Sequence, residues 1–139
     1  MRVVVDTNVL VSALLNPRGT PASVLHVVLE ERVTVCYDTR VLAEYEEVLN
    51  RREFAFEPQE VRGLIQLVRE TGMPVSAIPA GVRLSDPDDV AFAEVSISAK
   101  ADFLITGNLN HFPQRFGSTR VVTPAVFLAE FVKRAGDCA

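Results

Sequence analysis

The chain has 139 residues, of which 48% are hydrophobic and 23% are charged. This length suits one domain with its own core, and the composition excludes an intrinsically disordered protein. No apolar run approaches the roughly 20 residues of a membrane-spanning helix, and the stretch before Asp6 is too short for a signal peptide. We therefore expect residues 1–139 to form a single domain in the cytoplasm, with no membrane partner.

The formal net charge of −4 argues weakly against a broad nucleic-acid-binding surface, because Lys and Arg provide most phosphate contacts. A cluster of carboxylates in an active site would itself lower this charge, and bound divalent cations would reverse its local sign. Cys36 and Cys138 are predicted to be free thiols in a reducing compartment. No group of Cys and His residues has the spacing of a zinc site.

Short β-branched runs alternate with helical segments along the chain. Strands are predicted at residues 2–6, 33–37, 74–78, 103–106 and 120–122. These runs are apolar without alternation, which is typical of strands buried on both faces of a parallel sheet. Helices are predicted within residues 9–15 and from near positions 21, 39, 58, 87 and 124. The alternation indicates an α/β fold built on a parallel sheet.

A proline that follows a polar residue marks four of the predicted helix starts: Thr20-Pro21, Glu57-Pro58, Asp86-Pro87 and Thr123-Pro124. Proline is tolerated at the first helical position because its missing N–H would be unpaired there in any case. The Thr and Asp residues of these pairs are good N-caps. Gly72 is expected to end the helix that begins at Pro58.

Polar residues follow the predicted strands at the places where ligands bind in open parallel sheets, beyond the carboxyl ends of the strands. The segment Asp6-Thr7-Asn8 follows the first strand, Asp38 follows the second, and Thr106-Gly107-Asn108 follows the fourth. Asp86, Asp88 and Asp89 open the helix that leads into the fourth strand. We expect these groups to converge on one rim of the sheet.

Each of these acids also has a structural interpretation. Asp6 could form a turn or cap for the segment that follows it. In the predicted helix from Thr39, both Glu44 and Glu46 border the apolar face, so helical spacing alone does not choose between them. Asp86 and Asp89 have the spacing of a capping box.

Several carboxylates on one apolar rim repel one another, and a divalent cation would relieve that repulsion. Oxygen ligands without nearby Cys or His favour Mg²⁺ or Mn²⁺ over zinc. Such ions activate water and stabilise in-line displacement at phosphorus. The chain has neither a Walker-type phosphate loop nor the serine elbow of the α/β-hydrolases.

Four motifs together resemble the PIN-domain nucleases, and their order and spacing match over nearly the whole chain. The first is Val4-Val5-Asp6-Thr7-Asn8, and the second is the helix 41–49 with Glu44 in the acid position. The third is 86–89 followed by Phe92-Ala93-Glu94, with Asp89 in the acid position. The fourth is 104–108 followed by His111-Phe112. The most similar subgroup is the toxin-type PIN proteins of prokaryotic toxin–antitoxin systems.

The resemblance implies a three-layer α/β/α fold around a five-stranded parallel sheet of order 3-2-1-4-5. It also implies Mg²⁺- or Mn²⁺-dependent cleavage of phosphodiester bonds in single-stranded RNA. Asp6, Glu44 and Asp89 would hold the metal and orient the attacking water. The supporting residues would be Asn8 and Thr106, through hydrogen bonds, and Asp86, as an extra acid or a helix cap.

One position departs from the family pattern, because many PIN domains carry an acid where this chain has Asn108. An amide oxygen can ligate a metal but brings no charge. This departure from the pattern implies that a second metal site is weakened or absent, and that the activity is either weak or strongly dependent on metal concentration.

The leading hypothesis is a ribonuclease toxin that forms a homodimer and is silenced by a cognate antitoxin. Two alternatives stay open at this point: a housekeeping RNA-processing nuclease without an antitoxin, and a PIN fold kept as a binding or assembly module with little catalysis. The acidic composition and Asn108 favour the module, whereas the set of Asp6, Glu44 and Asp89 opposes it.

Overall fold

The computed structural model describes residues 1–137, so Cys138 lies outside the described residues. A single six-stranded sheet runs through it in the order β3-β2-β1-β4-β6-β5. All neighbouring strands are parallel except β5, which pairs antiparallel with β6. The strands are β1 (Arg2–Val5), β2 (Thr34–Tyr37), β3 (Met73–Pro74), β4 (Phe103–Ile105), β5 (Arg115–Phe116) and β6 (Thr119–Val122).

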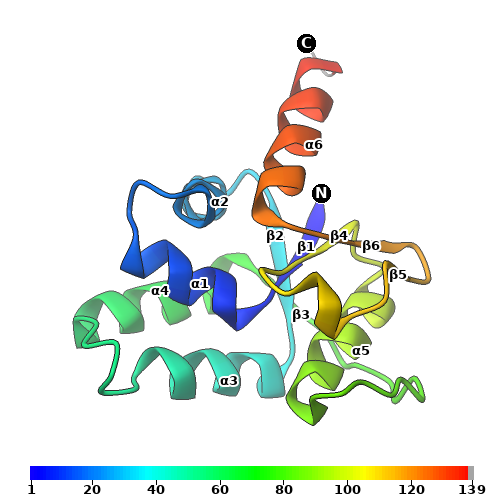
Figure 1. Ribbon diagram of the computed structural model, residues 1–139, viewed down its shortest axis with the longest axis horizontal. Helices are drawn as coiled ribbons and strands as arrows, with labels where there is room; N and C mark the ends of the chain where they lie inside the picture. Colours follow the sequence, from blue (N-terminus) through cyan, green and yellow to red (C-terminus); the bar gives the residue numbers. More distant parts are fainter. Residues whose placement is uncertain (138–139) are drawn as a thin grey trace.

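Helices connect the strands and cover the sheet (Figure 1). They are α1 (Thr7–Leu15), α2 (Thr20–Leu29), α3 (Thr39–Leu49), α4 (Pro58–Thr71), α5 (Val90–Ala99) and α6 (Pro124–Asp137), with short 3-10 turns η1 (Pro87–Asp89) and η2 (Leu109–His111). The strand order reverses direction after β3. Because parallel crossovers are right-handed, the return through α5 covers the face opposite to the outward crossovers. Among residues 1–137, no helix is long and apolar enough to cross a membrane.

The predicted α/β fold and the strand order up to the fourth strand are confirmed, and the predicted fifth strand is β6. The structure adds β5, a two-residue strand that turns back through Gly117 at a positive φ of 53°. The predicted third strand was too long, because only Met73 and Pro74 pair with β2. Val75 N still donates to Tyr37 O of β2 over 2.8 Å, and three residues later Ile78 N donates to Ser98 Oγ of α5 over 3.1 Å.

Three of the four helix starts agree with the prolines, whereas at Pro87 a 3-10 turn forms first and α5 begins at Val90. Thr20 is already helical and Gly19 is the N-cap residue, so the prediction that Thr20 caps α2 was wrong. Thr123 does cap α6, because its Oγ1 accepts a bond from Val126 N. Gly72 ends α4 at φ −81°, and a Cβ there would lie 2.5 Å from a carbonyl oxygen of the same helix. Close approach, rather than left-handed backbone, is thus the reason for that glycine.

The core explains why the site lies where it does. Val3, Val4 and Val5 are at most 2% exposed, so both faces of β1 are covered. The register pairs Val5 with Ile105, and Asp6 N donates to the Ile105 carbonyl over 2.9 Å. The residues that follow β1 and β4 therefore emerge side by side at the carboxyl edge of the sheet.

Candidate metal-binding nuclease site

Two loops at the ends of β1 and β4 are joined by side-chain hydrogen bonds. Thr106 Oγ1 donates to Asp6 Oδ2 over 2.8 Å and accepts from Asn108 N over 3.0 Å. Asn8 Oδ1 accepts from Gly107 N over 3.1 Å. The site residues that sequence analysis placed after these two strands are therefore in one network.

Asp6 does not act as a side-chain cap for α1, although it occupies the N-cap position. Its carboxylate is buried, with 6% of the residue exposed. Burial raises the pKa of Asp6, and the hydrogen bond from Thr106 opposes that rise. Of the two interpretations that the sequence left open, the geometry disfavours the cap and leaves a buried carboxylate at the mouth of β1.

Asp86 and Asp89 separate into two different environments. Asp86 Oδ1 accepts from Asp88 N over 3.0 Å and caps η1. Asp89 is 7% exposed, and within the described chain its Oδ2 is a buried oxygen without a hydrogen-bond partner. A complete capping box would turn this side chain back to the Asp86 backbone N–H. Desolvation, followed by the charge of Asp6, raises the pKa of Asp89 to about 6.

His111 is a site residue to which sequence analysis gave no role. Its Nδ1 lies 3.3 Å from Asp89 Oδ2, without the geometry of a hydrogen bond. The imidazole is about half exposed, on η2 just beyond Asn108. The signal for it was its place in the fourth motif, one short turn after a predicted site residue.

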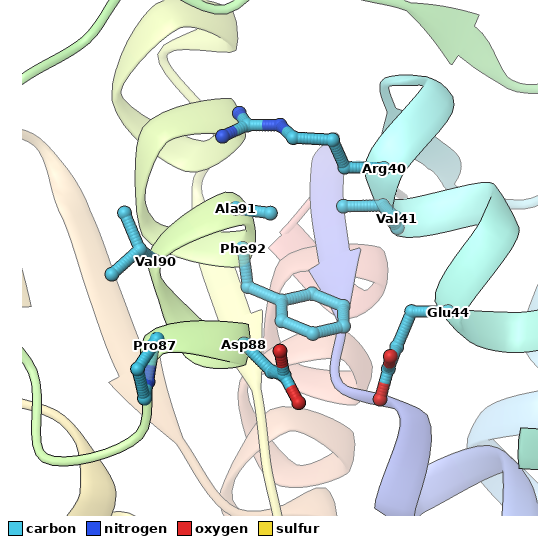
Figure 2. Close-up of a pocket in the computed structure, with 8 residues that line it drawn as sticks. All are labelled: Arg40, Val41, Glu44, Pro87, Asp88, Val90, Ala91 and Phe92. Atoms are coloured by element: carbon cyan, nitrogen blue, oxygen red, sulfur yellow. The ribbon is translucent and has the colours of Figure 1, made fainter.

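Helix α3 brings Glu44 to the same place. Its neighbour Glu46 points elsewhere and lies 3.8 Å from Arg69 on α4. Burial, together with the charge of Asp88, raises the pKa of Glu44. Figure 2 shows the Glu44 and Asp88 carboxylates facing each other from α3 and η1, beside the Phe92 ring.

The acids line one groove of about 320 Å³. Of the predicted site residues, it contains Asp6, Asn8, Glu44, Asp86, Asp89 and Asn108, while Thr106 lies behind Asp6. A neighbouring cavity of about 410 Å³ shares Glu44, Asp88 and Phe92 with the groove (Figure 2).

Two acids near this rim are engaged in other contacts. Asp38 was expected to join the site, but its Oδ1 accepts from Val41 N and caps α3. Arg40 pairs at 2.8 Å with both Asp38 and Glu94. Glu94 also accepts from Ala80 N over 2.9 Å. These two carboxylates therefore hold α3, α5 and the loop before η1 together.

The oxygen atoms that line the groove are of the chemical type that binds a hard divalent cation. Carboxylate and amide oxygens dominate its polar lining, and these are the ligands that Mg²⁺ and Mn²⁺ prefer. As the side chains lie, no three acidic, His or Cys residues in the described chain are close enough to share one ion. Asp89 Oδ2, which accepts no hydrogen bond, is an oxygen whose unmet bonding capacity a cation would satisfy.

Comparison of the sequence and the fold with known proteins identifies the class of protein to which this fold and acidic groove belong. A family model described as the PIN domain matches residues 2–110. The chain belongs to the PIN-domain family, whose members are generally nucleases. It is also 30% identical to an uncharacterized protein of Methanocaldococcus jannaschii, covering 96% of this chain and 93% of that protein.

A solved structure shares the fold at much lower sequence identity. It is the crystal structure of VapBC2 from Rickettsia felis bound to a DNA fragment from their promoter. The match has a TM-score of 0.57 and 15% identity, and covers 88% of this chain and 98% of that chain. The likeness supports the three-layer α/β/α architecture.

Proposed function

We propose that this protein is a metal-dependent endoribonuclease that cleaves phosphodiester bonds in single-stranded RNA. Asp6, Glu44 and Asp89 would be the catalytic acids and, with Asn108, the metal ligands. Asn8, Asp86 and Thr106 would support them. Membership of a family of nucleases supports this assignment, as does the position of these groups around one groove.

The single observation that carries the proposal is the buried Oδ2 of Asp89, which accepts no hydrogen bond although the His111 imidazole lies 3.3 Å away. The charge of Asp6 raises the pKa of this carboxyl further, so the two acids repel each other across the groove. An arrangement of this kind costs free energy in the protein alone. A cation in the groove would remove the cost, which is why acids that are not paired with Arg or Lys indicate a metal site.

Bound Mg²⁺ or Mn²⁺ would supply Lewis acidity and neutralise negative charge that develops on the phosphate. Within the protein, Thr106 fixes the rotamer of Asp6 by its hydrogen bond. The carboxylates of Glu44 and Asp89 accept hydrogen bonds from the attacking water and so orient it. Water adds to phosphorus and loses a proton to a carboxylate of the groove, while the bond to the leaving sugar oxygen breaks and that oxygen takes a proton from solvent. The products are one RNA fragment with a new phosphate end and one with a new hydroxyl end.

Cleavage of labelled single-stranded RNA with Mg²⁺ or Mn²⁺ tests this function. We expect metal-dependent cleavage that Asp6→Asn abolishes. Glu44→Gln should also abolish it, whereas Glu46→Gln is the matched control on the same helix and should leave activity unchanged. Equal activity of wild type and Asp6→Asn would point to a contaminating nuclease and overturn the assignment.

A weakly catalytic binding module is the second candidate, favoured by Asn108 in place of an acid. Calorimetric titration with Mn²⁺ separates it from the enzyme. Heat of binding that disappears in Asp6→Asn supports the nuclease. Absence of binding at millimolar Mn²⁺ supports the module.

We further propose that the nuclease is the toxin of a toxin–antitoxin pair, acting as a homodimer in the cytoplasm. The likeness to VapBC2, a complex bound to its promoter DNA, supports this proposal. Expression of the wild type should arrest growth, Asp6→Asn should be harmless, and the product of an adjacent small gene should restore growth. Harmless expression of an active wild-type enzyme would favour a housekeeping nuclease. Light scattering tests the dimer.

A further inference from the structure

The groove extends beyond its acids along helices α1 and α3. On this side it is lined by Glu44 and Val48 of α3, whose spacing of four places them on one helix face, and by Arg51, two residues beyond the last helical residue Leu49. At 1.5 Å of rise per residue, the helix runs about 7.5 Å from Glu44 to Leu49, and Arg51 follows beyond that end. The groove therefore has an acidic end, at the carboxyl edge of the sheet, and a second end near the close of α3.

An aromatic side chain lines the second end. Phe54 comes from the loop between α3 and α4 and is half-buried. Its ring stacks on Phe56, with centroids 5.5 Å apart and planes at 12°. The backbone also fixes this loop, because Phe54 N donates to Arg51 O and Ala55 adopts a positive φ of 52°. The Phe54 ring is therefore fixed in position, and Phe56 covers one of its two faces.

A cation, Arg51, lines the same groove as this ring. Arg51 pairs with Glu47 through Nε and Nη2, at 3.2 and 2.9 Å, and this pair leaves Nη1 out. The Arg51 side chain is 46% exposed. Among the residues described as lining the groove, Arg51 is the one with a permanent positive charge. The second end is therefore chemically unlike the acidic end.

Aromatic rings and basic side chains are the groups that bind single-stranded nucleic acid, through base stacking and phosphate contact. We propose that Phe54 and Arg51 form a subsite for a nucleotide next to the scissile phosphate. The base stacks on Phe54, and Arg51 contacts the adjoining phosphate. This inference rests on the proposed ribonuclease function and adds to it the means by which a groove of acids holds a polyanion.

The first test is binding of a labelled single-stranded RNA, measured by fluorescence anisotropy in the Asp6→Asn variant, which does not cleave and serves as the parent protein for the further substitutions. Phe54→Leu keeps an apolar side chain but removes the flat ring, and we expect about tenfold weaker binding, or about 1.4 kcal/mol. Phe54→Trp should bind as tightly as the parent. Ile78→Ala, an exposed apolar site away from the groove, is the control and should change nothing.

The second test uses RNAs that lack a single base at successive positions. Loss of one base near the cleavage site should weaken the parent about tenfold and Phe54→Leu very little further, because the same stack is then already absent. Arg51→Gln should lower the slope of log affinity against log salt by about 0.7, the loss of one phosphate contact. The subsite would be overturned if loss of the base and Phe54→Leu each weakened RNA binding by their full factor when combined. It would also be overturned if Arg51→Gln left the salt dependence of binding unchanged.

The two failures are distinguishable. If the parent protein binds RNA and the wild type cleaves it while Phe54→Leu binds equally well, this inference alone is overturned. If the parent binds no single-stranded RNA and the wild type cleaves none, the proposed function itself is overturned. Circular dichroism of each variant ensures that binding is compared between folded proteins.

Discussion

Thr106 Oγ1 donates a 2.8 Å hydrogen bond to Oδ2 of Asp6, which stands 100 positions earlier in the chain. Both residues are buried. The parallel register of β1 and β4 brings them together, because it pairs Val5 with Ile105. One hydroxyl group therefore ties a candidate metal ligand to the neighbouring strand and also accepts from Asn108 N.

Removal of this hydroxyl should weaken the site without altering the fold. Thr106→Val keeps the shape of the side chain but leaves Asp6 Oδ2 without its donor. We expect metal affinity and RNA cleavage to fall by roughly 10- to 100-fold, as for other groups that orient metal ligands. Thr106→Ser retains the donor and is the control. Calorimetry and a cleavage assay measure the effect, and equal behaviour of the Val and Ser variants would contradict it.

The raised pKa of Asp89 predicts how pH changes the stability of the metal-free protein. That pKa is about 6 in the fold, against an ordinary value of 3.8. The folded state therefore holds a proton that the unfolded chain has released between these values. The metal-free protein therefore has its full free energy of unfolding, as far as Asp89 is concerned, below about pH 4 and loses part of it as pH rises through about 6.

Asp89→Asn should abolish that pH dependence. With a chelator at neutral pH, the variant should unfold with a free energy about 1 kcal/mol higher than wild type, a value that allows for solvent screening in the groove. Below about pH 4 the difference should vanish. Urea unfolding at several pH values measures it. A variant that is less stable than wild type at neutral pH would show that the ionised Asp89 carboxylate does not destabilise the fold.

Two arginines, Arg40 on α3 and Arg51 just beyond its end, should differ sharply in their contribution to stability. Arg40 pairs at 2.8 Å with Asp38 and Glu94, whose side chains are only 10% and 9% exposed. Arg40→Met leaves both acids without this cation and should cost about 1–3 kcal/mol, a range reduced by the half-exposed guanidinium. Arg51→Met breaks an exposed pair with Glu47 and should cost about 0.5 kcal/mol or less. Similar losses in the two variants, measured by urea unfolding, would contradict this contrast.

Tyr45 connects α3 to the end of β1. Its hydroxyl is fully buried and donates to the carbonyl oxygen of Val5, the residue before Asp6. Tyr45→Phe should lower the free energy of unfolding by about 1 kcal/mol, because a buried carbonyl loses a donor. Tyr37→Phe removes a less buried bond to Arg69 O and should cost less. Thermal unfolding of both variants checks the order.

Local sequence signals predicted most elements because their causes are local. Proline fixes the backbone at the first turn of a helix, so α2, α4 and α6 begin within one residue of the predicted positions. Valine runs predicted β1 and β2 because β-branched residues suit strands that are covered on both faces. Strand β5 was missed, since two residues carry no periodicity and pair only because β6 lies beside them.

Among the site residues, those that follow strands were predictable from the rule that ligands bind at the carboxyl edge of a parallel sheet. Helical periodicity could not choose between Glu44 and Glu46, since both border the apolar face. Packing of α3 against its neighbours decides it, placing Glu44 in the groove and Glu46 beside Arg69. Asp38 is different, because its carboxylate caps α3 through Val41 N and pairs with Arg40, and both partners are close in sequence.

The sequence by itself determined the α/β class, the helix starts and the set of acids that PIN domains share, because these depend on neighbouring residues and on motif order. Only the tertiary structure decided which carboxylates are free. Asp89 has the spacing of a capping residue, yet it is buried, the charge of Asp6 raises its pKa, and its Oδ2 accepts no hydrogen bond, whereas Glu94 on α5 is paired with Arg40 on α3. The physical reason is that the electrostatic state of a carboxylate depends on burial and on partners from distant segments, which one stretch of sequence does not contain.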